Sequence, residues 1–256
     1  GSVGEAIARY MRAESCAKIS KEKIENLTKL EISGRDIFSI PDYAFRGFNN
    51  LLVLSIHSSP LVEINEYAFS GLNQVFELNI THNNKLTVLP AQLLYPLVNL
   101  DTLNLSHNNF VSLPDHLFRN ACTITHINLS FNQLKNLQKN VFMSSADSIC
   151  PYLTSLYLNN NQLEKIPEDF SELNLTSSPL RLNLDLSNNN IVKIPENAFL
   201  GIEEIYDLNL SNNQIYQIHE EAFSSLTNIS ALNLSRNKIS DITWKLPDSI
   251  MLSLDL

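Results

Sequence analysis

The stretch Leu100-Asp-Thr-Leu-Asn-Leu-Ser-His-Asn108-Asn-Phe110 decides how this chain folds, because close copies of it return along the sequence. Two of them are Ile205-Tyr-Asp-Leu-Asn-Leu-Ser-Asn-Asn213-Gln-Ile215 and Ile229-Ser-Ala-Leu-Asn-Leu-Ser-Arg-Asn237-Lys-Ile239. All fit the template L-x-x-L-x-L-x-x-N-x-L, whose copies start at Leu27, Leu51, Val75, Leu100, Ile124, Leu153, Arg181, Ile205, Ile229 and Met251. Most copies are 24 residues apart. Such a period predicts a repeat protein in which one structural unit stacks on the next.

Leu103 and Leu105 show how one copy folds, because apolar residues at alternate positions are typical of a strand with one buried face. We expect their neighbours to face solvent, and one strand from each copy to join a parallel sheet. The asparagine at template position nine follows the strand, where its amide can pair backbone groups that would otherwise be buried without partners. In six copies this residue is Asn108, Asn132, Asn161, Asn189, Asn213 and Asn237.

A second signal, Ile-Pro-x-x-x-Phe or a near copy, comes later in the repeat. It runs over residues 40–45, 166–170 and 194–199, and the series of aromatic residues is Phe45, Phe69, Phe118, Phe142, Phe170, Phe199 and Phe223. We expect these side chains to stack into a spine beneath the outer side of the molecule. Packing, rather than ligand binding, is the role predicted for them.

Asp42-Tyr-Ala-Phe45-Arg-Gly47 and Glu66-Tyr-Ala-Phe69-Ser-Gly71 carry a family resemblance. The chain resembles the typical, 24-residue class of extracellular leucine-rich repeats, and these segments are similar to those of Toll-type receptor and Slit-type ectodomains. The resemblance covers roughly residues 27–256. It implies an α/β fold: a leucine-rich-repeat solenoid curved like a horseshoe, with a concave parallel β-sheet and a convex side of loops and short helical turns.

Residues 27–256 are therefore expected to form a leucine-rich-repeat domain of about ten repeats, the last truncated, and residues 1–26 an N-terminal capping segment. Val3, Ile7, Tyr10 and Met11 would share one face of a helix that covers the open first repeat. The resemblance implies a paired-cysteine cap, whereas this chain offers only Cys16 there. We expect the chain to be a fragment of a longer protein.

Some repeats depart from the template. The first two carry Arg35 and Ser59 in place of the asparagine at position nine, and the third has one extra residue around Asn83. The fifth and sixth repeats are lengthened to 29 and 28 residues, and insertions in a solenoid go to loops. Residues 143–152 and 171–180 are thus expected to bulge side by side, either as a second recognition feature or as tolerated surface variation.

Charge and motifs argue against several functions. The chain carries 27 acidic and 18 basic residues, so the basic surface of a nucleic-acid or anionic-membrane binder is missing. No apolar run approaches the ~20 residues of a membrane-spanning helix, so no direct membrane insertion is expected within this chain. No nucleophile-elbow, zinc-protease, C-x-x-C or phosphate-loop motif is present. We therefore expect neither catalysis nor a cofactor.

Cys122 and Cys150 lie two and three residues before the next repeat starts. Equivalent places in consecutive repeats are about one strand spacing apart, ~5 Å, which suits a disulfide. We predict a disulfide between Cys122 and Cys150. The alternative is two free thiols, which a cytosolic protein would keep.

Eight Asn-x-Ser/Thr sequons occur, but five of them contain an asparagine of the repeat itself, as in Leu103-Asn-Leu-Ser106. Asn26, Asn174 and Asn228 lie outside that place, so they are the better candidates for glycosylation. An extracellular or cell-surface glycoprotein is favoured over a cytoplasmic protein.

Large rings gather on the solvent side of the expected sheet, at template positions two, three, five, seven and eight. Small polar residues dominate these positions, yet repeats three to six place there Phe76, His82, His107, His126, Phe131 and Tyr157. Exposed aromatic side chains on a rigid face are typical of binding hot spots. We predict that a protein ligand docks on this concave face, with Lys29 and Arg236 near its ends contributing little. The alternative is that isolated exposed rings are ordinary.

His82 and His107 occupy one column on adjacent strands and are close enough to share a metal ion. No third ligand is evident beside them, so no metal site is predicted. A pH-sensitive contact suits the pair better, because charging neighbouring imidazoles near pH ~6 would change the local field.

These observations predict a non-catalytic protein-binding module, the ligand-binding ectodomain fragment of a receptor or part of a secreted protein. An intracellular scaffold or pathogen effector is one alternative, which the redox state of Cys122 and Cys150 and the presence of glycans would discriminate. A structural adhesion or spacer element is another, and it would place its interface on the exposed end or the sheet edge.

Overall fold

The computed structural model describes residues 2–121, 123–137, 140–142, 152–167, 181–241, 243–246 and 253–255. Within these ranges, helical elements lie only before the first repeat: α1 (Val3–Tyr10), the 3-10 turn η1 (Cys16–Lys18) and α2 (Lys21–Glu25). The ten strands of the main sheet are β1 (Lys29–Ser33), β3 (Val53–His57), β5 (Glu77–Thr81), β6 (Thr102–Asn104), β7 (His126–Asn128), β8 (Ser155–Tyr157), β9 (Leu182–Asp185), β11 (Glu204–Asn209), β13 (Asn228–Asn233) and β14 (Ser253–Asp255).

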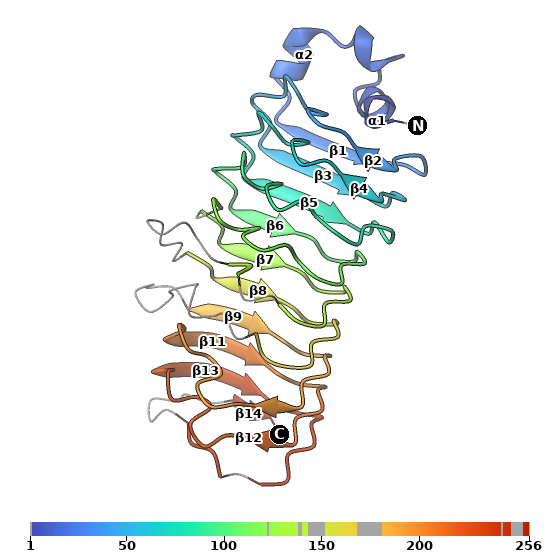
Figure 1. Ribbon diagram of the computed structural model, residues 1–256. Helices are drawn as coiled ribbons and strands as arrows, with labels where there is room; N and C mark the ends of the chain where they lie inside the picture. The colour runs from blue at the N-terminus through green and yellow to red at the C-terminus, as the bar shows by residue number, and fades with distance from the viewer. Residues whose placement is uncertain are drawn as a thin grey trace.

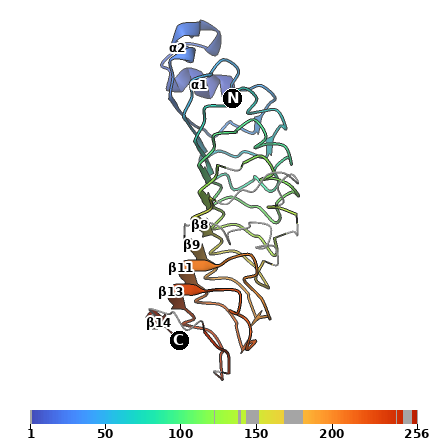
Figure 2. The ribbon, with the colours of Figure 1, turned by 90° about the vertical axis from the view of Figure 1, so that its left-hand side faces the viewer.

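The main sheet is parallel throughout, and its strands follow one another in sequence order from β1 to β14 (Figure 1). Each strand pairs in register with its counterpart one repeat away, as Leu78 with Leu103 and Leu103 with Ile127. The sheet lines one side of the solenoid, and the connecting segments run along the other side (Figure 2). The predicted leucine-rich-repeat architecture is confirmed.

Alternating burial along the strands places the core beneath the sheet. In β3, Leu54 and Ile56 are fully buried while Val53, Ser55 and His57 are half-buried. The start of the seventh repeat needs a correction, because Leu182 is buried and pairs with Ile205, whereas Arg181 is exposed. The mismatch of one residue is absorbed by a bulge at Tyr206 in β11.

The asparagines at position nine form the predicted ladder of amides, which are buried in every repeat from Asn108 to Asn213 and half-buried at Asn237. In each case the side-chain Nδ2 donates to carbonyl groups of its own repeat and of the preceding one, as Asn189 does to Leu186 and Leu158, both at 3.0 Å. Its Oδ1 accepts from the backbone N–H of Leu163 at 2.9 Å. The ladder begins at Asn83, which is fully buried and bonds the carbonyls of Ile56 and Thr81.

The aromatic spine is also confirmed where the structure describes it. Ring centroids are 5.9 Å apart for Phe45 and Phe69, 5.1 Å for Phe118 and Phe142, and 5.6 Å for Phe199 and Phe223. All six of these side chains are buried. Phe170 lies outside the described residues. In the third repeat the equivalent place is taken by Leu94, which is equally buried.

The N-terminal helix α1 packs against β1 at the start of the sheet. Ser2 caps the helix, because its Oγ accepts from the N–H of Glu5 while its own N–H donates to the Glu5 carboxylate. Val3, Ile7 and Met11 are buried on the face that covers the first repeat. Tyr10 remains 38% exposed, and its hydroxyl donates to the Lys29 carbonyl at 3.1 Å.

The side away from the sheet is built from turns and from two small parallel sheets that the sequence did not predict. These sheets pair β2 (Ser39–Ile40) with β4 (Glu63–Ile64), and β10 (Lys193–Ile194) with β12 (Gln217–Ile218). The N–H of Asn109 donates to the Leu86 carbonyl, and this bond places the extra residue of the third repeat between Asn83 and Leu86. The lengthened segments fall at 143–151 and 168–180, outside the described residues.

Candidate functional site

The six rings predicted to form the binding surface all reach the solvent side of the main sheet or its edge. Phe76 is 41% exposed, Phe131 45% and Tyr157 37%. His82 and His126 are exposed, and His107 is half-buried. None of them contributes to the buried core, so each can be replaced without opening a cavity.

Three of the six rings are stacked on one another. The centroids of His82 and His107 are 4.3 Å apart, those of His107 and Phe131 are 4.2 Å apart, and both ring pairs are inclined by only 10°. We call these three side chains the ring column. Each occupies template position eight, just beyond the ends of β5, β6 and β7. Successive parallel strands place this position at intervals close to one strand spacing, and rings at such intervals can stack.

The backbone beneath the ring column has the left-handed conformation. His82, His107 and Phe131 have positive φ angles of 57°, 56° and 55°. The same conformation occurs at position eight of the next three repeats, where Asn160, Asn188 and Asn212 occupy it. Histidine and asparagine both tolerate this conformation, whereas a bulky phenylalanine is an uncommon occupant. Three consecutive repeats therefore carry an aromatic ring at a position that is asparagine in the three repeats after them.

Electrostatics distinguish the centre of the ring column. Burial, and secondly the neighbouring His82, lower the pKa of the His107 imidazole. A neutral His107 is favoured because the charged form would lose hydration and face a second imidazole of the same sign. The pair therefore resists carrying two charges in the unbound protein.

The other three predicted rings lie apart from the ring column. Phe76 stands at template position two, before β5, and its N–H donates to the Leu52 carbonyl at 3.0 Å. Leu52 is itself 37% exposed, so it adds an apolar neighbour that the pattern of aromatic residues does not include. His126 opens β7, where its Nδ1 lies 2.5 Å from the Thr125 hydroxyl. Tyr157 ends β8, at position five.

The prediction that template position seven faces solvent is wrong in four repeats, where the serines Ser106, Ser130, Ser187 and Ser211 are buried. In the first repeat, by contrast, Ser33 at this position is exposed, and His57 in the second is half-buried. The cause is a local bond, because the N–H of Ser106 donates to the Asn104 Oδ1 at 3.0 Å and that of Ser130 donates to the Asn128 Oδ1 at 3.0 Å. These bonds turn the serines away from the concave face.

A second feature of the sheet face is a carboxylate pair farther along the chain. Burial, and secondly the neighbouring Asp185, raise the pKa of Asp207. The two groups lie on β9 and β11, close to the exposed ring of Tyr206. Tyr206 stands at template position two, which the repeat pattern assigns to the solvent side, and the register shift in β11 falls at this residue.

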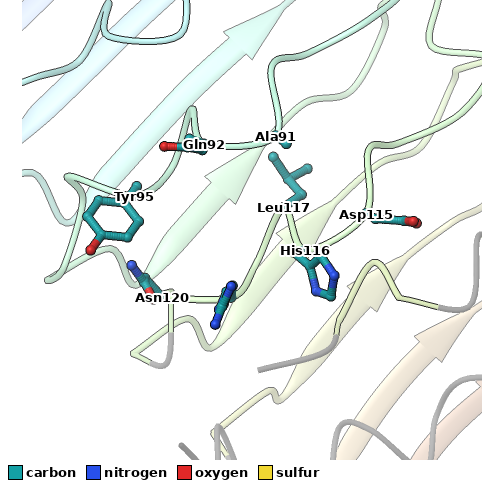
Figure 3. A pocket seen from close by; sticks show the side chains of 8 residues that line it. Ala91, Gln92, Tyr95, Asp115, His116, Leu117 and Asn120 are labelled. Atoms are coloured by element: carbon teal, nitrogen blue, oxygen red, sulfur yellow. The ribbon is translucent and has the colours of Figure 1, made fainter. Parts of the chain in front are cut away.

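A pocket of about 550 Å³ lies away from the sheet, between the turns of the third and fourth repeats. Figure 3 shows Gln92 and Tyr95 on one turn and His116 and Asn120 on the next. No ring of the predicted surface lines this pocket. We therefore treat it as separate from the concave face.

The predicted modification sites divide between described and undescribed parts of the chain. Cys122, Cys150 and Asn174 lie outside the described residues. Asn26 is exposed at the end of α2, and Asn228 is half-buried at the start of β13. Cys16 is exposed and forms no disulfide within the part of the chain that the structure describes.

The described residues contain no candidate membrane span and no candidate metal cluster. No helix among them is both long and apolar enough to span a membrane. No group of three or more histidine, cysteine, aspartate or glutamate side chains comes together among them in a way that could hold a metal ion.

Comparison with protein families gives matches along most of the chain. A family model described as "Leucine rich repeat" matches residues 25–86, 98–148 and 182–242, and another with the same description matches residues 152–179. These matches coincide with the repeats of the main sheet.

Among curated proteins, the chain is similar to fibromodulins. Bovine fibromodulin (Bos taurus) is 40% identical over 87 residues, which are 33% of this chain and 22% of fibromodulin. Human fibromodulin (Homo sapiens) is 41% identical over 70 residues, which are 27% of this chain and 17% of fibromodulin. The matched stretch thus spans about a fifth of the length of these relatives.

Two solved structures share the fold over nearly the whole chain. A chain in the complex of Toll with Spatzle, from Drosophila, has a TM-score of 0.67 and 25% identity, and the match covers 92% of this chain and 34% of that one. A chain in the complex of TLR13 with ssRNA13 has a TM-score of 0.61 and 24% identity, with 87% of this chain and 28% of that one covered.

Proposed function

Since this chain belongs to the leucine-rich-repeat family, we propose that it is a non-catalytic recognition module that binds a protein ligand on its concave face. The observation that carries the proposal is the ring column, in which three consecutive repeats stack aromatic rings on the solvent side of the sheet. Fold alone would not identify a function, because one fold hosts many. The stacked rings of the ring column support the concave face as the binding surface.

A protein ligand is favoured over a nucleic acid. The formal net charge of the chain is -9, and binding to phosphate backbones depends on clustered Lys and Arg. The similarity to a chain of the Toll–Spatzle complex adds support, because a solenoid of this kind takes part there in a complex with another protein.

The proposal predicts the effect of removing three exposed rings together. The variant Phe76→Ala, Phe131→Ala and Tyr157→Ala should weaken binding of a partner captured with this chain by roughly 100-fold, because hot-spot rings carry most of an interface's free energy. Its circular dichroism should be unchanged, since all three side chains are exposed. Isothermal titration with the identified partner measures the effect.

A matched control replaces three exposed rings that lie off the main sheet, Phe38, Tyr95 and Tyr216, by alanine. This variant should bind the partner as the unmodified chain does. Unchanged binding by the first variant, together with loss of binding after changes in residues 143–152 or 171–180, would contradict docking on the concave face.

We further propose an extracellular or cell-surface location for this module, which the similarity to fibromodulin and to Toll supports. The location carries two chemical expectations, a disulfide between Cys122 and Cys150 and glycans at Asn26, Asn174 and Asn228. The disulfide needs an oxidising compartment, and the glycans need passage through the secretory pathway.

Mass mapping of non-reduced protein from a secretory host checks this location. We expect one peptide pair joined through Cys122 and Cys150, and a glycan on at least one of the three asparagines. Two free thiols, or three bare asparagines, would count against it. Cys16, which is exposed, serves as the internal reference for a thiol that reacts freely.

A further inference from the structure

The ring column exposes rims rather than faces. His107 has His82 on one face at 4.3 Å and Phe131 on the other at 4.2 Å. The part of His107 that still reaches solvent is therefore the edge of its ring. The edge of an aromatic ring carries the positive end of its quadrupole, and an imidazole edge also carries the N–H donors. Such a rim attracts an anionic group rather than an apolar or cationic one.

The ring nitrogens at this rim are without partners. Among the described residues, no group makes a hydrogen bond to a ring nitrogen of His82 or His107. Three other histidines contrast with them, because His57, His126 and His219 each engage a ring nitrogen. The unused donors of the ring column point to a hydrogen-bond acceptor that this chain does not supply.

The charged groups on neighbouring strands are already engaged. Glu31 lies 2.9 Å from His57, Glu77 accepts from Asn79 at 2.8 Å, and Asp101 accepts from Thr125 at 2.8 Å. These carboxylates keep their negative charge, but each is already bonded to another side chain. None of the three is hydrogen-bonded to a ring nitrogen of His82 or His107, so those nitrogens stay open to an acceptor from outside the described residues.

We propose that the rims of His82 and His107 together bind a carboxylate of the protein partner, the side chain of an aspartate or a glutamate. This assignment rests on the proposed function, since it takes the partner to be a protein on the concave face. Phe131 closes the far side of the pair and excludes water from it. Charge-assisted hydrogen bonds to such a rim are stronger than neutral ones.

Binding of a carboxylate takes up protons at this site. In the unbound protein, the lowered pKa of His107 means that the folded chain holds fewer protons there than the unfolded chain, so His107 costs stability as pH falls below ~6.5. A bound carboxylate offsets the repulsion from His82, because its negative charge stabilises the charged imidazole. The pKa is higher in the complex, so affinity increases as pH falls from ~7.5 to ~5.5.

Nuclear magnetic resonance of the full chain with labelled histidines tests the assignment. The probe is acetyl-Glu-Ala-Glu-amide, and the control probe is the uncharged acetyl-Gln-Ala-Gln-amide. We expect only the acidic peptide to shift the His82 and His107 ring signals and to raise their pKa values. The affinity of the acidic peptide should be roughly tenfold higher at pH ~5.5 than at pH ~7.5, because a pKa that is about one unit higher in the complex changes the affinity by about that factor.

The variants take their replacements from the chain's own repeats. His82→Asn with His107→Asn installs the residue found at Asn160, Asn188 and Asn212, so the turn is retained. This double variant should bind the acidic peptide roughly tenfold more weakly, whereas His116→Asn, off the main sheet, should bind it unchanged. If the double variant does not fold, His107→Asn alone should bind the acidic peptide roughly threefold more weakly than the unmodified chain does.

Three outcomes would overturn the carboxylate assignment: equal ring shifts with both peptides, unchanged peptide affinity of the variants, or tighter binding of inorganic sulfate than of the acidic peptide. The last would assign the rim to a sulfate or phosphate group. Failure here is distinguishable from failure of the proposed function. Suppose that a partner requires Phe76, Phe131 and Tyr157 but binds the double histidine variant as well as it binds the unmodified chain. That result would support docking on the concave face and contradict the carboxylate assignment.

Discussion

Replacing Phe223 by alanine is expected to lower the free energy of unfolding by about 3–5 kcal/mol, the largest effect that any single substitution discussed here should have. The ring is 1% exposed and lies between Phe199 at 5.6 Å and the indole of Trp244 at 5.7 Å. Alanine removes the ring from the spine and leaves a cavity that two aromatic neighbours cannot fill. Trp244 is the only tryptophan of the chain, so its fluorescence during urea denaturation reports the loss locally.

Phe223→Leu is the matched comparison, because the third repeat already carries a buried leucine, Leu94, at the equivalent place. We expect this variant to lose only about 1 kcal/mol, since most of the volume is kept. Tyr206→Ala, which removes a ring that is 55% exposed, should stay within about 0.5 kcal/mol of the unmodified chain. Equal losses for the alanine and leucine variants at Phe223 would contradict a packing role for the spine.

Asn189→Ala is expected to lower the free energy of unfolding by about 3 kcal/mol, because it leaves several buried backbone groups without partners. The lost bonds are those to the carbonyls of Leu158 and Leu186 and from the N–H of Leu163. Hydrogen exchange measures the effect residue by residue. The Leu163 amide should exchange much faster, while the amides of β3, five strands away, keep their protection.

The control for this substitution is the next residue, Asn190. Its side chain is exposed and makes no hydrogen bond within the described part of the chain, although its backbone N–H donates to the Leu163 carbonyl. Asn190→Ala should therefore change stability by less than about 0.5 kcal/mol. A comparable loss of stability in both variants would show that the loss comes from a disturbed turn rather than from removal of the buried amide.

The fold could be predicted from sequence because each of the features that define a repeat recurs along the chain. A buried leucine at alternate positions, an asparagine at the strand end and a phenylalanine on the outer side recur in register. A departure from the template in one copy therefore does not obscure the pattern, because the other copies of the ten still show it. Arg181 shows where this reasoning fails, since the template placed the repeat start there while burial selects Leu182. One repeat seen alone would not reveal a bulge that arises only from pairing with the next strand.

The candidate site could be predicted only in part. The sequence indicated which rings lie on the solvent side, but not that three of them stack while Phe76, His126 and Tyr157 stand apart. The three stacked rings share template position eight, whereas Phe76, His126 and Tyr157 stand at positions two, three and five, which lie elsewhere along the strands. The burial of Ser106 and Ser130 was missed for a similar reason, because a bond between positions five and seven overrides simple alternation.

The asparagine ladder also bears on how the chain reaches its native state. Asn132 bonds the Leu105 carbonyl 27 residues earlier, and its Oδ1 accepts from the Phe110 amide 22 residues earlier. Contacts of this span need only short loops to close, so the contact order stays low for a protein of 256 residues. During synthesis each repeat can dock on its predecessor as soon as its own asparagine has emerged from the ribosome. Folding can thus proceed vectorially from the N-terminal helix, with the last completed repeat serving as the template for the next.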